Sequence, residues 1–425
     1  IGGPKPGMGN VISGNSSQGV VLDTSATGNT VAGNLIGLNA AGTAAVPNTF
    51  AGVEMVAGAT SNTIGGTSGG RNFIAGNSYY GIAIDGSGTG SNVVVGNTIG
   101  LAPSGATVAN ANGGVVFFGG AQSNVVGGST AGAANLISGN TQRGVDIFDS
   151  TTTGNAISGN SIYGNGGIGI NLVGGSENSF LVTSNDVGDA DTGPNNLQNY
   201  PVLASAVLGI GTNVQGTLNS IANSTFRIEL FASATADPSG HGPGQNFLGA
   251  FNVTTNGSGS ASFNMTFAPS VLAGQVISAT ATDATGNTSE FSANVTVTTT
   301  DSDNDGIPDV YENAHGLNPH SIDANLDADG DGVSNLAEFL AGTDPKNPSS
   351  AFRLAPPTFS NGDVIITLST VAGHVYRVEY ANDLTSANHW RTLVDQVLAT
   401  GSSLQVTDPG AASVGRQFYR AIVLP

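Results

Sequence analysis

A short repeated phrase constrains the fold of this chain more than any other feature of the sequence. In each copy, Asn is followed by any residue and then by Ile or Val, with Gly or Gly-Asn close behind. Copies that lie 62 or 63 residues apart match one another. Repetition at a fixed period is typical of stacked repeat architectures, in which each unit contacts mainly its neighbours. The eight copies begin at Asn10, Asn29, Asn62, Asn72, Asn92, Asn124, Asn135 and Asn155.

We expect each unit to hold about three coils of about 21 residues in a parallel β-solenoid. Helical repeats need long stretches without Gly, whereas here Gly and Asn recur at short intervals and turn corners easily. The alternating runs Val20–Leu22, Ile82–Ile84 and Val145–Ile147 are predicted to be strands with inward aliphatic side chains. Equivalent Asn residues of adjacent coils would then lie about 4.8 Å apart and form amide ladders.

Two longer phrases carry a family resemblance. GNTVAGNLIGLNAAGTAAVPN (28–48) and SNVVVGNTIGLAPSGATVANAN (91–112) resemble the repeats of bacterial right-handed parallel β-helix proteins with the pectin-lyase-like fold. The resemblance covers residues 1–197 and implies a right-handed parallel β-helix of a secreted or surface protein. It leaves the activity open, because this fold hosts lyases, hydrolases, adhesins and inert shafts.

The first residues match the middle of the repeat. Ile1-Gly2-Gly3 aligns with Ile64-Gly65-Gly66 and with Val126-Gly127-Gly128. An uncovered solenoid end presents unpaired strand edges. We therefore expect upstream coils, a cap or a neighbouring protein chain at this end of the β-helix.

The repeat ends in the segment 185–203, which contains three acids and two prolines. Short alternating runs follow it, including 225–231, 261–267 and 276–282, and this pattern predicts a β-sandwich. The phrase ATDATGNTSEFS (281–292) resembles bacterial immunoglobulin-like modules, which commonly act as spacers. Alternating runs return after residue 351 and predict a second, C-terminal β-sandwich.

Between these two sandwiches lies a strongly acidic segment. Residues 301–344 hold 11 of the 29 acids and no Lys or Arg. Two twelve-residue stretches within it match the calcium-loop pattern, with acids at positions 1, 3, 5 and 12 and Gly at position 6. A solvated acidic linker is the alternative, since acid runs without this spacing are usually that.

We predict two Ca²⁺ sites in these loops, because Ca²⁺ takes six to eight oxygen ligands and Gly permits the sharp turn. The paired loops, over residues 301–350, resemble thrombospondin type 3 or dockerin-like bacterial calcium repeats. Calcium sites of extracellular modules are weak, so this resemblance implies a calcium-rich exterior. The expected ligands are Asp301, Asp303, Asp305, Ile307, Asp309 and Glu312 in the first loop, and Asp327, Asp329, Asp331, Val333, Asn335 and Glu338 in the second.

The sequence thus predicts an all-β chain with one short calcium-binding segment. Its expected parts are a parallel β-helix (1–197), an immunoglobulin-like β-sandwich (198–299), a calcium-binding linker (300–350) and a C-terminal β-sandwich (351–425).

Three weaker candidates lie outside the calcium loops. Asp186, Asp189 and Asp191 could bind a third cation or only solvate the end of the β-helix. Tyr79 and Tyr80, with Arg143 in a matching polar column, could contact a glycan through their ring faces, or form an ordinary polar surface.

A catalytic acid pair is not expected in the β-helix. Asp23 and Asp85 occupy equivalent positions, and three coils between them would separate them by about 14 Å. Glycosidase carboxyl pairs lie at most about 9.5 Å apart. We therefore name no catalytic residue.

The charge and hydropathy of the chain argue against some classes of partner. The net charge of −19 argues against nucleic acid or an anionic membrane as a partner, and the sequence has no run of 18 apolar residues. We expect a secreted or cell-surface scaffold with a structural or adhesive role, which could assemble into a filament or sheath with neighbouring chains. The alternative is a protein that binds or degrades polysaccharides, and cell-surface glycans are candidate partners in either case.

Overall fold

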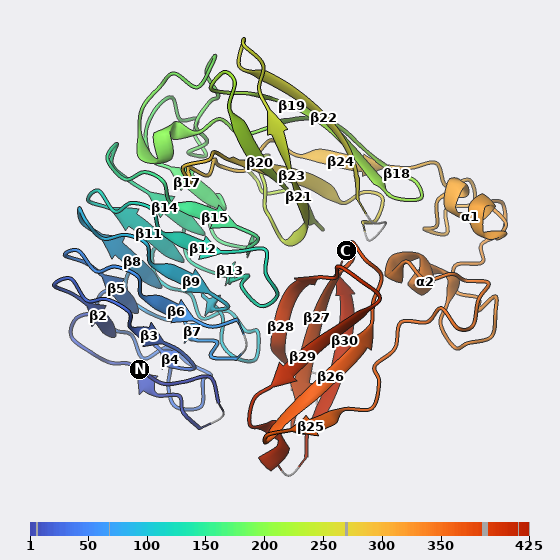
Figure 1. The fold of residues 1–425 in the computed structure, drawn as a ribbon, viewed down its shortest axis with the longest axis horizontal. Helices are drawn as coiled ribbons and strands as arrows, with labels where there is room; N and C mark the ends of the chain where they lie inside the picture. The colour runs from blue at the N-terminus through green and yellow to red at the C-terminus, as the bar shows by residue number, and fades with distance from the viewer. Residues whose placement is uncertain (6, 68, 268–270, 385–389, 415, 425) are drawn as a thin grey trace.

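The structure is a computed structural model that describes residues 1–425 except 6, 68, 268–270, 385–389, 415 and 425. The chain is all-β, as predicted, and begins with three stacked parallel sheets (Figure 1). The first sheet contains β1 (Val11–Ile12), β4 (Leu35–Ile36), β7 (Phe73–Ile74), β10 (Thr98–Ile99), β13 (Leu136–Ser138) and β16 (Ser161–Tyr163). The second contains β2 (Val20–Leu22), β5 (Val53–Met55), β8 (Ile82–Asp85), β11 (Val115–Phe118), β14 (Val145–Ile147) and β17 (Ile170–Leu172). The third contains β3 (Thr30–Val31), β6 (Thr63–Gly65), β9 (Val93–Val95), β12 (Val125–Gly127) and β15 (Ala156–Ser158).

The predicted coil length is wrong. In the second sheet Val20 pairs with Val53, and Val53 pairs with Ile82, so successive coils are 33 and 29 residues long. A unit of about 62 residues therefore holds two coils with up to three strands each, not three coils. The short spacings between copies of the phrase do not correspond to whole coils, because the phrase precedes strands of two different sheets. One copy begins at Asn62 before β6, and the next begins at Asn72 before β7.

Alternation within these short strands builds the core of the β-helix. Side chains of a strand point to opposite faces in turn, so a three-residue strand sends its outer two residues inward. In β8, Ile82 and Ile84 are fully buried and pack in the same aliphatic cluster as Ile64 and Ile74 of neighbouring sheets. Large fully buried aliphatic side chains stabilise a fold by about 1.5–3 kcal/mol each.

Three ladders of Asn side chains run along the corners of the β-helix. Asn92, fully buried, is typical: its backbone N–H and its Nδ2 donate to Oδ1 of Asn124, and its own Oδ1 accepts from both groups of Asn62. Its Nδ2 also donates to the carbonyl of Ala59. The ladders are Asn10-34-72-97-135-160, Asn15-48-77-110-140-165 and Asn29-62-92-124-155-195.

The last coil of the β-helix is covered by residues from further along the chain. Asn195, in the 3₁₀ helix η1 (Pro194–Leu197), ends one ladder by accepting from Asn155. The carboxylate of Glu290 accepts from the backbone N–H groups of Leu172 and Thr183 at 2.9 Å. These contacts satisfy donors that would otherwise lie unpaired at the end of the stack.

Seven strands beyond the β-helix form one sheet, in the order β21-β20-β23-β24-β18-β19-β22. All pairs are antiparallel except β18 with β24. Side chains such as Val214 and Phe263 pack against Ile228 and Ile277 in one core. The strands are β18 (Val202–Leu208), β19 (Thr212–Asn219), β20 (Thr225–Ser233), β21 (Asn246–Thr254), β22 (Ser260–Phe267), β23 (Val276–Thr282) and β24 (Val295–Thr298).

Two short helices, α1 (Asp309–His315) and α2 (Asn335–Ala341), lie between this sheet and the C-terminal module. The C-terminal module holds two three-stranded antiparallel sheets around its own apolar core. One sheet contains β25 (Thr358–Ser360), β26 (Asp363–Ser369) and β29 (Ser403–Asp408), and the other contains β28 (Arg391–Leu398), β27 (Val375–Ala381) and β30 (Phe418–Leu424). Residues Ala411–Ser413 form the 3₁₀ helix η3.

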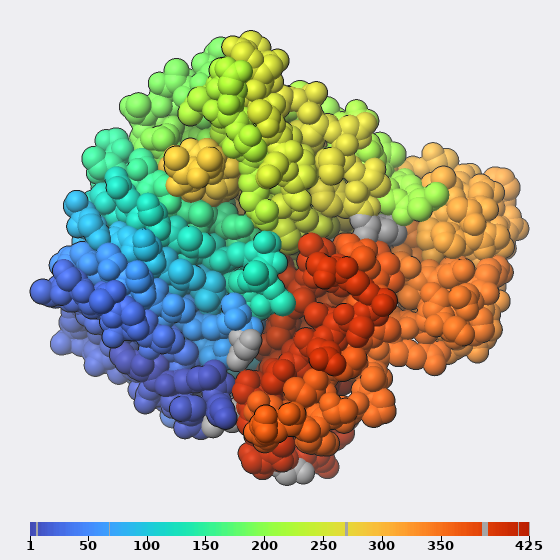
Figure 2. Space-filling view, in the orientation of Figure 1, coloured from blue at the N-terminus to red at the C-terminus, as the bar shows by residue number. Residues whose placement is uncertain are grey.

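The chain closes on itself, because the C-terminal module, red in Figures 1 and 2, lies against the flank of the β-helix. Gln396 of β28 also contacts the seven-stranded sheet by accepting from the backbone N–H of Phe247. No helix in the described part of the chain is long and apolar enough to cross a membrane.

Candidate metal centre

The two acidic loops adopt the same local structure. In the first loop, the carboxylate of Asp301 accepts from the backbone N–H groups of Asn304 and Gly306, and in the second Asp327 accepts from Gly330 and Gly332. Gly306 and Gly332 have φ values of 98° and 96°, a conformation that side chains rarely adopt. The turn at position 6 of each loop therefore requires Gly, as the sequence pattern predicts.

These turns gather the carboxylates that the sequence singled out. Asp301, Asp303 and Asp305 each bring one oxygen within 4.8 Å of the others, and Asp327, Asp329 and Asp331 do the same. Like charges at this separation repel one another unless a cation lies between them.

Helices α1 and α2 each bury one further carboxylate beside these groups. Glu312 is fully buried, and neither of its oxygens has a hydrogen-bond partner among the described residues. Glu338 is also fully buried; one oxygen accepts from Thr343, and the other has no partner in the described part of the chain. Asp303 and Asp329 each bury one unpartnered oxygen too. Buried carboxylate oxygens without donors are strongly unfavourable, so this donor set fits a hard cation such as Ca²⁺.

Burial and crowding also change the acidity of the two glutamates. Burial, and then the nearby charges of Asp303 and Asp305, raise the pKa of Glu312 to about 7. Burial and the charge of Asp329 raise the pKa of Glu338 to about 7. A divalent cation stabilises the ionised form of both groups, so metal binding would release protons from them near neutral pH.

The predicted ligands at position 9 are engaged elsewhere. The carboxylate of Asp309 accepts from the backbone N–H and the hydroxyl of Ser302, and these hydrogen bonds lower its pKa. Asn335 makes the equivalent contact, since its Oδ1 accepts from the N–H of Ala328. Each side chain thus fastens its helix to the start of its loop. At position 7, where a calcium loop supplies a backbone carbonyl, the side chain of Ile307 in the first loop is fully buried.

The structure adds Asp323, which the sequence analysis missed. Asp323, Asp305 and Glu312 bring carboxylate oxygens within 4.8 Å of one another. The backbone N–H groups of Asp323 and Ala324 also donate to Oδ2 of Asp305. The twelve-residue pattern of the first loop ends at Glu312, eleven residues before Asp323, so the pattern does not assign Asp323 to this loop.

The two loops form one structural unit. The rings of Tyr311 in α1 and Phe339 in α2 lie edge to face with centroids 4.7 Å apart. The hydroxyl of Tyr311 donates to the carbonyl of Thr343 at 3.1 Å. These contacts fix the two carboxylate groups relative to each other.

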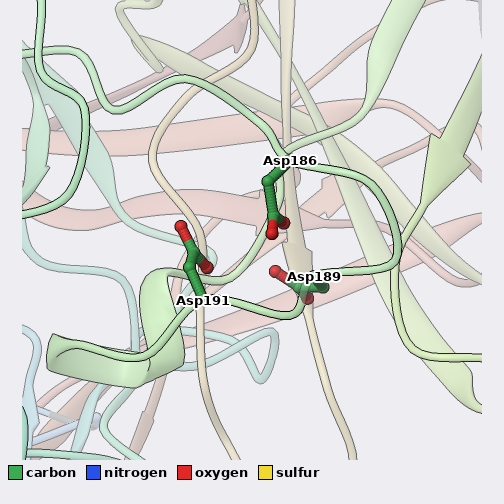
Figure 3. A group of neighbouring side chains, drawn as sticks. All are labelled: Asp186, Asp189 and Asp191. Atoms are coloured by element: carbon green, nitrogen blue, oxygen red, sulfur yellow. The ribbon is translucent and has the colours of Figure 1, made fainter.

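The third acidic group lies where the chain leaves the β-helix, between β17 and η1 (Figure 3). Asp186, Asp189 and Asp191 bring carboxylate oxygens within 4.8 Å of one another. The carboxylate of Asp189 already accepts from the N–H of Asn199 and from the hydroxyl of Ser220, and burial raises its pKa to about 6. It therefore anchors the segment after the β-helix to the end of β19, and a third cation here stays a prediction.

The candidate glycan residues lie on the outer face of the second sheet. Tyr80 is only 3% exposed, and its hydroxyl donates to Asp146 at 2.8 Å. Arg143 forms an ion pair with the same carboxylate, and the ring of Tyr79 stacks on Phe50 at 4.6 Å. Tyr80 and Arg143 thus hold a fully buried Asp146 in place. A glycan contact at Tyr79, Tyr80 and Arg143 stays a prediction.

The corrected coil length changes the estimate for Asp23 and Asp85. They are separated by two coils, because β2, β5 and β8 are consecutive in the second sheet. At about 4.8 Å per coil the backbone separation is about 9.6 Å, not 14 Å. This value lies at the upper limit for inverting glycosidases, so the distance no longer argues against a carboxyl pair. Glu54 of β5 is buried beside both, and burial raises its pKa.

Comparison with known families agrees with the geometry of the acidic loops. The family of bacterial TSP3 repeats matches residues 301–321 and 327–348, and no curated protein matches the chain. TSP3 repeats bind calcium, and the bacterial ones are typical of extracellular proteins. The match covers these two segments alone. The acidic segment of this chain is therefore similar to two bacterial TSP3 repeats, and we call its two loop-and-helix units the TSP3 repeats. Their carboxylates are gathered as a calcium site requires.

Proposed function

We propose that this protein is a calcium-stabilised extracellular scaffold with a structural or adhesive role. The observation that carries the proposal is the burial of Glu312 and Glu338 with unpartnered oxygens beside two clusters of aspartates. A chain evolved to work without a cation would not be expected to bury these groups, because each unsatisfied carboxylate costs several kcal/mol.

Calcium at these loops would stiffen the middle of the molecule. Ile307, Tyr311 and Phe339 pack in the same apolar core as the seven-stranded sheet. On the other side, Arg353 of the C-terminal module donates to the backbone carbonyl of Asp331 in the second loop. When Ca²⁺ is bound it neutralises the crowded carboxylates, and the loops then hold both neighbouring parts at a fixed distance.

The proposed scaffold role also draws on the β-helix. Its Asn ladders satisfy buried polar groups within the chain, which favours a rigid shaft. Along each ladder Nδ2 donates to Oδ1 of the Asn in the next coil, so each Oδ1 accepts from the coil before it. A partner at the exposed Asn10, Asn15 and Asn29 must therefore present donors, as a further coil running in the same direction would. Stacking through the opposite end is blocked, since η1 and Glu290 cover it.

Calcium binding is tested by isothermal titration of the full chain. We expect two sites in the wild type and the loss of one site in each of Glu312→Gln and Glu338→Gln. Asp237→Asn, which alters a carboxylate outside the loops, is the matched control and should bind as the wild type. Unchanged stoichiometry and affinity in both glutamine variants would overturn the proposal.

The structural role is tested separately by electron microscopy of the protein with calcium and after chelation with EGTA. A regular assembly in calcium that is lost in EGTA is the result expected for a filament or sheath. Discrete particles in both conditions would leave an adhesive monomer.

A second candidate function is polysaccharide cleavage, for which Asp23, Glu54 and Asp85 offer three neighbouring carboxylates along the second sheet. Glu54 lies between them on the same sheet, with a raised pKa that suits a proton donor. Turnover of a panel of polysaccharides by the wild type, abolished by Asp85→Asn, would support it. Absence of turnover across the panel counts against it.

A further inference from the structure

A groove runs along the seam between the β-helix and the C-terminal module, where the blue and red parts meet in Figure 2. It consists of two adjoining cavities of about 480 and 260 Å³. Both are lined by Ala41 and Pro103 from the β-helix and by Tyr380 and Arg391 from the C-terminal module. The groove is thus elongated and is much larger than a single inorganic ion.

Basic residues gather in this groove although the chain as a whole carries a net charge of −19. Five of the ten Lys and Arg side chains form ion pairs with acids elsewhere. Lys5, Arg71 and Arg391 line the groove instead, and within the described part of the chain none of them forms an ion pair. Two acids, Asp383 and Asp408, also line the groove, so its three cations outnumber its acids by one on a protein that is strongly negative overall.

Arg71 shows that a partner is missing. Its Nη1 donates to the hydroxyl of Thr98 at 2.9 Å, but its Nε is shielded from solvent and has no acceptor among the described residues. Burial lowers the pKa of Arg71, and the nearby charge of Asp395 raises it. The carboxylate of Asp395 is already engaged, because it accepts from both Nε and Nη2 of Arg377. The shielded Nε is out of reach of a ligand in the groove, but Arg71 carries a charge without an ion-pair partner in the part of the chain that the structure describes, and an anionic group in the groove would stabilise that charge.

The remaining lining suits a chain of sugar rings. Tyr380, Phe73 and Pro103 offer apolar surfaces on which a pyranose can stack. Much of the wall on the β-helix side is glycine, including Gly33, Gly69 and Gly70. These residues leave the backbone accessible to hydroxyl groups. A peptide that bound as an added strand would need to pair along the whole of the edge strand β28. Only the first three residues of β28, Arg391, Thr392 and Leu393, line the groove.

We infer that this groove binds an acidic oligosaccharide, with Arg71 and Arg391 contacting its carboxylate or sulfate groups and Tyr380 contacting a ring face. The inference gives the proposed adhesive role a ligand class. It does not depend on the calcium sites for its test, because the groove residues lie outside 301–350.

The test is titration calorimetry on the full chain at one fixed calcium concentration with three linear tetrasaccharides. One carries uronic acids, one carries sulfate esters and one is neutral. We expect at least one acidic tetrasaccharide to bind with an affinity that falls as salt rises, and the neutral one not to bind. The acidic probe that binds better identifies the anionic group.

Two groove variants and one control variant locate the site. Arg391→Gln changes an exposed side chain at the start of β28 and should weaken binding about tenfold or more, the expected effect of losing a charged hydrogen bond. Arg416→Gln changes an exposed arginine outside the groove and should bind as the wild type. Arg71→Gln should weaken binding further, with thermal unfolding measured alongside because Arg71 lies at a module contact.

Three results would overturn the inference: equal binding of the neutral and acidic tetrasaccharides, undiminished binding by Arg391→Gln, or binding of a polyglutamate peptide without binding of either acidic tetrasaccharide. None of these results bears on calcium, which the titration of the loop variants tests by itself. Failure of the scaffold proposal and failure of the glycan groove are therefore distinguishable.

Discussion

The β-helix and the TSP3 repeats both place rows of like polar side chains close together, but they satisfy them differently. In the β-helix each buried Asn donates to one neighbour and accepts from the other, as Asn92 does between Asn62 and Asn124. In the TSP3 repeats Glu312 and Glu338 bury oxygens with no partner in the described residues. An amide carries both donors and an acceptor, so identical side chains can bond to one another. Carboxylates only accept, and a row of them needs a cation.

The largest expected effect is that of calcium removal on the TSP3 repeats. At free calcium 100 times the dissociation constant, two sites together stabilise the folded form by about 5 kcal/mol. Chelation should therefore abolish hydrogen-exchange protection over α1 and α2 and open the segment 301–350 to proteolysis. The strands of the β-helix should keep their protection, since their polar groups need no ion. Equal loss of protection in both regions would erase the contrast between them.

A substitution within an Asn ladder would leave buried polar groups of the β-helix without partners, as the carboxylates of the TSP3 repeats are without calcium. Asn92→Ala removes both donors of the side chain and the acceptor used by Asn62. Buried groups left unpaired each cost about 1–3 kcal/mol, so we expect a loss of about 3 kcal/mol in the free energy of unfolding, measured with denaturant. Asn29→Ala, at the exposed end of the same ladder, is the control and should cost less than about 1 kcal/mol. Similar losses in the two variants would mean that the ladder contributes little.

His374 tests the junction between the TSP3 repeats and the C-terminal module. Its ring is 1% exposed, lies against Gly342 at the end of α2 and has no hydrogen-bond partner for either ring nitrogen among the described residues. Burial lowers its pKa to about 4 from the ordinary value of 6.5. Between these values the unfolded chain binds more protons, so this contribution to stability is complete above pH 6.5 and is lost as the pH falls towards 4.

For this histidine alone, lowering the pH from 7 to 5 should reduce the free energy of unfolding by about 2 kcal/mol. The measurement is denaturant unfolding of the wild type and of His374→Phe, which keeps a ring but cannot be protonated, at both pH values. The variant should lose less stability than the wild type by that amount. Parallel pH profiles for the two proteins would show that His374 is not the titrating group.

The repeat predicted the strands of the β-helix but not the length of its coils. The runs beginning at Val20, Ile82 and Val145 are strands of one sheet, as expected. The predicted coil length was wrong because the repeated phrase occurs at only two of the three corners of each coil. The third corner, with the ladder that contains Asn15, lacks the phrase, so a local sequence pattern could not assign it to a coil. How corners stack depends on backbone pairing between residues about 30 apart.

The metal centre was predictable where chemistry is local. The acids at positions 1, 3 and 5 and the Gly at position 6 lie where the loop pattern places them, because Asx-type turns depend on neighbours in sequence. Asp323 and the burial of Glu312 were not predictable, since both depend on how the helices pack. The sequence likewise could not show that Arg353 reaches Asp331 from another module.

The smallest expected effect concerns this last contact. Nη2 of Arg353 lies 3.4 Å from Oδ2 of Asp331, and the arginine side chain is 59% exposed. Exposed ion pairs contribute little, so Arg353→Gln should change the free energy of unfolding without calcium by less than about 0.5 kcal/mol. Calcium affinity, in contrast, should increase in this variant. The guanidinium neutralises a carboxylate that the second site needs, and its removal should raise calcium affinity at that site about twofold.

Titration of Arg353→Gln against Arg416→Gln, which removes an equal charge from outside the TSP3 repeats, separates this local effect from the change in net charge. An equal rise in calcium affinity for both variants would assign the effect to net charge alone. Weaker binding by Arg353→Gln would mean that the arginine holds the loop in its binding conformation. In the expected case, the arginine neutralises part of the negative charge that bound Ca²⁺ would balance, whereas each buried Asn of the β-helix is satisfied by a neighbouring Asn.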